Sequence, residues 1–145
     1  MPQKGRIKAV IIGAGRIASG FDNSESKEIL THAHAYIKHN KVNLIGFFDI
    51  DYKASKDAAQ KWSCSSFEDF DKMFTEIEPD IVSVCTPDES HFDILKKVLV
   101  YKPSLIICEK PATTSVRKTE EIISLCHQVE VPVLINFSFL SNASL

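Results

Sequence analysis

The chain has 145 residues, of which 44% are hydrophobic and 25% charged, and its 17 basic and 19 acidic residues give a formal net charge of -2. These values are typical of one globular domain and argue against disorder or a fibrous class. No basic run could follow a nucleic-acid backbone, and no apolar run approaches the roughly 20 residues of a membrane-spanning helix. We therefore expect a single soluble domain over residues 1–145, with its core over about 6–137 and a tail over 138–145.

Short apolar runs alternate along the chain with segments of helical spacing. Runs that are apolar at both alternate positions are typical of strands covered on both faces; they span residues 7–12, 42–49, 80–86, 104–109 and 131–136, with a weaker run at 65–67. Helices are predicted over residues 29–39, 53–62, 70–77, 91–100 and 116–129. This order predicts an α/β fold, a doubly wound and mostly parallel sheet of about six strands. The polar stretch 19–30 predicts an insertion or a helix in two parts.

A glycine turn follows the first predicted strand, where Gly13, Gly15 and Ala18 form the pattern G-x-G-x-x-A. In Rossmann-like dinucleotide-binding folds the first glycine makes a tight turn and the second lets the backbone approach a pyrophosphate. The small third residue allows close packing of helix on strand. The phosphates then lie on amide groups at the start of the helix. A turn of small residues without a ligand is the alternative, but the alternating strands and helices favour the dinucleotide interpretation.

Asp49 ends the second predicted strand, where a carboxylate accepts hydrogen bonds from the adenosine ribose of a dinucleotide. Its charge would repel the additional phosphate of NADP, and no basic residue follows before Lys53. NAD is therefore favoured over NADP. The polar stretch accounts for the long spacing between Asp49 and the glycines. A simple turn residue at the end of a strand is the alternative.

Glu109, Lys110 and Pro111 follow the fifth predicted strand, at the edge where open α/β sheets bind ligands. A partly buried ammonium there can stabilise a developing alkoxide and take part in proton transfer. Lys110 is therefore predicted to be catalytic. The alternative is that Glu109 and Lys110 are only the first polar residues to leave a buried strand.

Cysteine and histidine spacing argues against disulfides and metal centres. The four cysteines include no C-x-x-C pair, and three lie in apolar segments, as is typical of free thiols in a reducing cytoplasm. His32 and His34 are two residues apart, so a helix points them to different faces. We predict a cytoplasmic protein without a bound metal, in which either histidine could lie near the cofactor.

Four motifs in this order resemble the N-terminal half of the Gfo/Idh/MocA oxidoreductase family: GAGRIA at 13–18, FFD at 47–49, CTPDESH at 85–91 and CEKPATT at 108–114. The resemblance extends from about residue 6 to residue 137. It implies a cofactor site formed by Gly13, Ala14, Gly15, Arg16, Ile17, Asp49, Thr86, Pro87, His91, Glu109 and Lys110. In that site Thr86 and Pro87 would line the nicotinamide side. Glu109 would face the nicotinamide ribose, and Lys110 would reach the substrate hydroxyl.

The same resemblance implies a reaction and a missing part. Family members transfer hydride between NAD(P) and a hydroxyl-bearing carbon of a sugar, cyclitol or related compound. A second α/β half, absent here, usually supplies the substrate pocket and the dimer surface. We therefore expect a cofactor domain that binds NAD with little turnover, an apolar patch where the second half would pack, and self-association left open. A non-catalytic nucleotide-sensing or scaffold domain and an adenosylmethionine-dependent methyltransferase are the alternatives.

Overall fold

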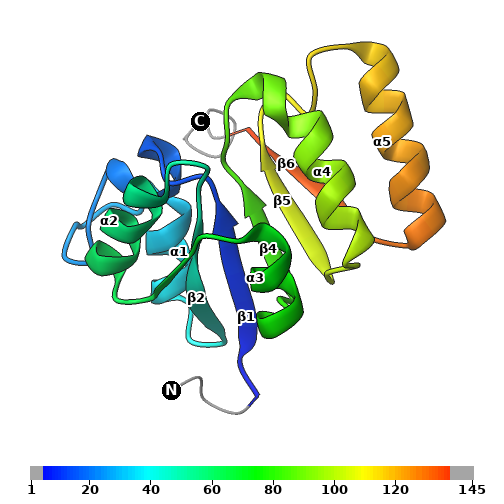
Figure 1. The fold of residues 1–145 in the computed structure, drawn as a ribbon. Coiled ribbons are helices and arrows are strands. Elements are labelled where there is room, and N and C mark those ends of the chain that lie inside the picture. Colours follow the sequence, from blue (N-terminus) through cyan, green and yellow to red (C-terminus); the bar gives the residue numbers. More distant parts are fainter. Residues whose placement is uncertain (1–4, 138–145) are drawn as a thin grey trace.

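The computed structural model describes residues 5–137, whose six strands form one parallel sheet in the order β3-β2-β1-β4-β5-β6 (Figure 1). The strands are β1 (Ile7–Ile12), β2 (Val42–Phe48), β3 (Ser65–Phe67), β4 (Ile81–Val84), β5 (Leu105–Glu109) and β6 (Val133–Asn136). The helices are a π-helix η1 (Arg16–Gly20), α1 (His32–Lys38), α2 (Tyr52–Trp62), α3 (Phe70–Ile77), a 3-10 turn η2 (Asp88–Ser90), α4 (His91–Val100) and α5 (Val116–Val129). The predicted doubly wound fold and its strand order along the chain are confirmed.

Strand β1 is buried on both faces, which explains why its sequence is apolar at both alternate positions. Val10 and Ile12 belong to the core under α3, α4 and α5, whereas Ala9 and Ile11 belong to the core under α1 and α2. None of these four side chains is more than 1% exposed. Burial of this kind stabilises a domain by about 25 cal/mol per Å² of apolar surface, so β1 is the element around which both layers assemble.

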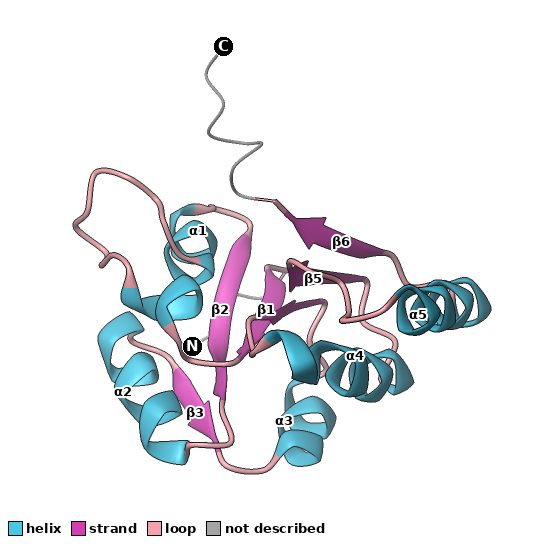
Figure 2. Ribbon diagram, turned by 90° about the horizontal axis from the view of Figure 1, so that it is seen from above, coloured by secondary structure: helices cyan, strands magenta, loops and turns pink. Residues whose placement is uncertain are grey.

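The two faces of the sheet are covered unequally. Figure 2 shows α3, α4 and α5 along one face, while α1 lies on the other face over β1 and β2. Within residues 5–137, no helix covers this second face of β5 and β6 (Figure 2). Leu134 of β6 points to that face and is 56% exposed. The uncovered face borders the carboxyl edge of the sheet and therefore bears on the functional site.

The first crossover is in two parts, as the polar stretch predicts. It consists of η1, a loop and α1, which begins later than predicted because Thr31 caps it by accepting a hydrogen bond from the His34 amide at 3.1 Å. Asp22 fixes the loop. Its buried carboxylate accepts hydrogen bonds from the Leu30 amide at 2.6 Å, from Thr31 Oγ1 at 2.6 Å and from His34 Nδ1 at 2.7 Å. Burial acts to raise the pKa of Asp22, but these hydrogen bonds outweigh it and the pKa lies below its ordinary value.

Replacing Asp22 by Asn should reduce the free energy of unfolding by about 2–3 kcal/mol, because an amide nitrogen would then face donors in a buried site. Urea unfolding at pH 7 measures this loss. The matched control is Asp57→Asn, which removes an exposed pair with Lys53 and should change stability by less than about 0.5 kcal/mol. Equal stability of the two variants would contradict the proposed role of Asp22.

Candidate functional site

The candidate site lies at the carboxyl edge of the sheet, between β1 and β4. The chain continues from β1 to β2 and β3 on one side of β1, and then from β4 to β6 on the other side of β1. The sheet therefore changes direction between β1 and β4, and open α/β sheets bind ligands at such a topological switch point. Gly13 and Cys85 leave the two strands side by side, with the Cys85 amide donating to Ile12 O at 2.8 Å. The sheet therefore brings together the glycine turn and the loops after β2, β4 and β5.

The two glycines of the turn differ in what surrounds them. Gly13 has φ +96°, and a Cβ built there would lie 2.6 Å from the carbonyl oxygen of Cys85, so only glycine fits. A Cβ at Gly15 would meet no atom within 4 Å. Gly13 is thus required by the fold, whereas Gly15 borders open space in which a ligand could approach the backbone.

The helix after the turn is shorter than a regular first Rossmann helix. It is the five-residue π-helix η1, in which Arg16 is exposed, Ile17 is half-buried and Ala18 is fully buried against the strands. Burial of Ala18 confirms the packing predicted for a small residue. Because so short a helix carries little macrodipole, any phosphate here would depend on direct contact with the first backbone amides.

Asp49 is joined directly to the glycine turn. Its Oδ2 accepts a hydrogen bond from the Ala14 amide at 2.8 Å, and its Oδ1 accepts one from the Asp51 amide at 2.8 Å. The carboxylate therefore lies beside the turn, although 35 residues separate Asp49 from Ala14. The first basic residue after it, Lys53, is exposed and pairs with Asp57 at 2.8 Å.

The loop after β4 presents Thr86 and Pro87, which are half-buried and exposed, respectively. His91, which the resemblance assigns to the cofactor site, is the first residue of α4. It is 0% exposed, and its Nδ1 and Nε2 lie 2.6 Å from Pro111 O and 2.9 Å from Thr86 O. His91 thus lies beneath the loops after β4 and β5 and ties them together. Any effect of His91 on a ligand would pass through these loops.

Glu109 and Lys110 leave β5 in different environments. The Glu109 carboxylate accepts hydrogen bonds at Oε1 from His32 Nε2 at 2.6 Å and from Asn136 Nδ2 at 2.7 Å. Burial acts to raise the pKa of Glu109, but these hydrogen bonds outweigh it, so the pKa lies below its ordinary value of 4.5. Lys110 is exposed, which differs from the partly buried setting expected for a catalytic ammonium. Lys110 is the first residue after β5, and no other part of residues 5–137 buries its side chain.

Sequence interpretation allowed His32 or His34 to lie near the cofactor but missed the other polar residues around Glu109, which are Tyr36, Ser83 and Asn136. His32 and Tyr36 are four residues apart on α1, and both contact the hydroxyl of Ser83 on β4. Their i, i+4 spacing was the available signal. His34 points elsewhere, to Asp22, which confirms that the two histidines lie on different faces. Within the described part of the chain, no three potential ligand side chains group into a metal site.

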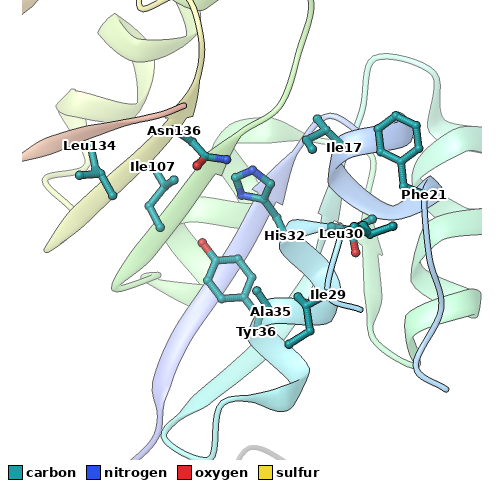
Figure 3. Close-up of a pocket in the computed structure, with 11 residues that line it drawn as sticks. Ile17, Phe21, Ile29, Leu30, His32, Ala35, Tyr36, Ile107, Leu134 and Asn136 are labelled. Atoms are coloured by element: carbon teal, nitrogen blue, oxygen red, sulfur yellow. The ribbon is translucent and has the colours of Figure 1, made fainter. Parts of the chain in front are cut away.

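A cavity of about 460 Å³ opens beside this cluster on the uncovered face of the sheet (Figure 3). His32, Tyr36 and Asn136 form its polar part. Its apolar rim includes four exposed side chains, Phe21, Ile29, Leu30 and Leu134, each 45–56% exposed. Exposed apolar side chains therefore gather next to the site, and the expectation that a second half packs on them stays a prediction.

The model of the Gfo/Idh/MocA oxidoreductases, described as an oxidoreductase family with an NAD-binding Rossmann fold, matches residues 7–137. The chain belongs to this family. It is 26% identical over 117 residues to the D-glucoside 3-dehydrogenase of Escherichia coli strain K12, a match that covers 80% of this chain and 30% of that protein. The stated resemblance is thus confirmed.

Solved structures share the fold. The WlbA dehydrogenase from Chromobacterium violaceum, in complex with NADH and UDP-GlcNAcA, has a TM-score of 0.77 and 22% identity over 92% of this chain and 35% of its own. UDP-N-acetylglucosamine 3-dehydrogenase GnnA from Acidithiobacillus ferrooxidans has a TM-score of 0.74 and 23% identity over 90% and 38%. The chain thus spans about a third of the length of the relatives it matches. Among residues 5–137, no helix has the length and apolar character needed to cross a bilayer.

Replacing Glu109 by Gln should remove a pH-dependent part of the stability. The ionised carboxylate of the wild type stabilises the fold above pH 4.5, the ordinary pKa, and this stabilisation is lost as the pH falls through the lower pKa of the folded state. At pH 7 the variant should be less stable by about 1–2 kcal/mol, and the difference should narrow below pH 4.5. Urea unfolding between pH 3 and 7 measures both curves. Both proteins contain Asp22, so the contribution of Asp22 to the pH dependence cancels in the difference between them. A difference in the free energy of unfolding that stays constant between pH 3 and 7 would contradict the lowered pKa of Glu109.

Proposed function

We propose that this chain is the NAD-binding part of an oxidoreductase that acts on a hydroxyl group of a sugar or polyol. The observation that carries the proposal is the convergence of the glycine turn, Asp49 and Glu109 at the switch point of the sheet. The membership in the family supports NAD as the cofactor class. The names of its relatives, a glucoside dehydrogenase and a nucleotide-sugar dehydrogenase, support a sugar hydroxyl as the substrate group.

The adenosine end of NAD would lie over the glycine turn. The open space at Gly15 leaves room for the pyrophosphate against the backbone, in contact with Arg16 and the amide of Ile17, because the Ala14 amide already donates to Asp49. Asp49, already joined to the turn, would accept hydrogen bonds from the adenosine ribose. A carboxylate at this position, with Asp51 following it, favours NAD over NADP because the additional phosphate would face negative charge.

The nicotinamide end would lie between the loops after β4 and β5. When bound, the cofactor exchanges a hydride with the substrate carbon. Thr86 and Pro87 would flank the ring from one side, and Glu109 would orient the nearby ribose. Lys110 would hold the substrate hydroxyl and exchange its proton. Because Lys110 is exposed, this role would require a further wall, which the part of the family's proteins that this chain does not span would supply.

The two alternatives differ in what they require of the site. An adenosylmethionine-dependent methyltransferase usually reverses an edge strand, whereas β6 here runs parallel to β5. A non-catalytic nucleotide-sensing domain would use Gly13, Gly15 and Asp49 in the same way but would have no need for Lys110. Ligand titration addresses the first alternative. The second predicts the same NADH binding, and turnover that depends on Lys110 is the result that would exclude it.

Calorimetric titration of the chain with NADH, NADPH and adenosylmethionine should show binding of NADH, at least about tenfold weaker binding of NADPH and no binding of adenosylmethionine. A tenfold ratio corresponds to about 1.4 kcal/mol of repulsion at Asp49.

The variant Gly15→Val should weaken NADH binding at least about tenfold, because the valine side chain fills the open space beside the turn. Its free energy of unfolding should change by less than about 1 kcal/mol. Tight binding of adenosylmethionine without NADH would overturn the proposal.

The chain alone should oxidise polyols and sugars slowly or not at all, because residues 5–137 supply only one side of the substrate site. The rate of NADH formation measures this activity. It is followed by absorbance at the nicotinamide band after addition of NAD and a panel of sugars and cyclitols. Rapid steady-state turnover by the chain alone would sink the idea that a second wall is needed. In that case Lys110→Met should abolish the turnover, and an unaffected rate would favour a different catalytic group.

A further inference from the structure

A chain of hydrogen bonds runs under the candidate site from α1 to β5. The Tyr36 hydroxyl lies 2.6 Å from Ser83 Oγ, Ser83 Oγ lies 2.8 Å from His32 Nδ1, and His32 Nε2 lies 2.6 Å from Glu109 Oε1. Asn136 of β6 adds the second contact to the same carboxylate oxygen. All of these groups are buried or half-buried. Figure 3 shows the His32 ring between Tyr36 and Asn136, on the side of the sheet where the cavity opens.

The carboxylate fixes the direction of these hydrogen bonds. Glu109 is ionised at neutral pH because its pKa is lowered, so both of its oxygens only accept. His32 Nε2 must then carry a proton and donate, whether the ring is neutral or cationic. In the neutral ring Nδ1 accepts from the Ser83 hydroxyl, and that oxygen in turn accepts from Tyr36. Each hydrogen bond of the series is then donated in the direction of Glu109. Only one orientation of the His32 ring satisfies both Ser83 and Glu109.

The two carboxylate oxygens of Glu109 differ in their hydrogen-bond partners. Oε1 accepts two hydrogen bonds, whereas the residues that the structure describes give Oε2 no donor. Oε2 is also accessible to solvent. A buried Oε2 without a donor would be a buried polar side-chain atom without a hydrogen-bond partner, and within residues 5–137 the only such atom is His34 Nε2. Ribose hydroxyls are donors that a charged acceptor binds strongly. The carboxylate therefore presents one held oxygen and one available oxygen at the carboxyl edge of the sheet.

We propose that His32 is a positioning residue for the cofactor: it holds Glu109 so that Oε2 accepts a hydrogen bond from a hydroxyl of the nicotinamide ribose. This inference rests on the proposed function and adds to it a residue outside the four motifs. His32 acts through Glu109, so its contribution should be felt by ligands that reach β5 and not by ligands that end at the glycine turn. ADP is such a short ligand, because it lacks the nicotinamide ribose.

The test compares NADH and ADP binding to the wild type and to His32→Leu, which keeps the volume but removes the donor. NADH affinity should fall at least about tenfold, while ADP affinity stays within about twofold. His32→Gln places an amide N–H near the former Nε2 and should restore most of the NADH affinity. His127→Leu on the exposed face of α5 is the matched control and should change neither affinity.

A double-mutant cycle separates positioning from folding. If His32 acts through Glu109, the variant carrying both His32→Leu and Glu109→Gln should lose no more NADH affinity than Glu109→Gln alone. Additive losses, unchanged NADH affinity in folded His32→Leu, or equal losses for NADH and ADP would each overturn the positioning role. A wild type that binds ADP but not NADH would also overturn it. A wild type that binds neither ligand would instead show that the proposed function itself is wrong, and the inference would fall with it.

Discussion

Burial of β1 on both faces is the constraint on which the rest of the structure depends. A strand in this position needs a helical layer on each side and a neighbouring strand at each edge, and the chain supplies them in the order that right-handed crossovers allow. One result is that β1 and β4 end together. At that point Gly13 lies against the backbone of Cys85, where a side chain would not fit. The same packing that builds the core thus creates the tight turn to which a dinucleotide site can be attached.

On the second face of the sheet, polar contacts join α1 to strands that no helix of residues 5–137 covers. Between α1 and strands β4, β5 and β6, a hydrogen-bonded cluster of His32, Ser83 and Glu109 replaces the apolar contacts found elsewhere. Buried polar groups cost free energy unless they are paired, so such a cluster is tolerated because its members satisfy one another. The cluster also links α1 to β5 across 77 residues of sequence, which makes the position of Glu109 depend on a distant helix.

Local pattern and turn chemistry were enough to predict the six strands, five helices and the interrupted crossover. The glycine turn and Asp49 could be placed together because the carboxyl ends of parallel strands meet at one edge. The His32–Glu109 contact could not be predicted, since nothing near either residue specifies which face of α1 meets which strand. The exposure of Lys110 was not predicted for a related reason: a residue at the end of a buried strand is buried only if another element covers it. His91 shows the converse, because its helix lies beneath two loops and buries it.

These observations divide the site into two ends of unequal completeness. The proposed adenosine end is formed by groups that already contact one another: Asp49 accepts a hydrogen bond from the Ala14 amide, and the fold requires glycine at Gly13. The proposed nicotinamide end has an acceptor held in place, Glu109, but an exposed Lys110 and exposed apolar side chains beside it. A cofactor bound here would gain its affinity mainly at the adenosine end and its orientation at Glu109, while the chemistry would wait for a group that covers Lys110. In this proposed arrangement the hydrogen bonds from His32 and Asn136 hold Glu109 in place without any group that covers Lys110.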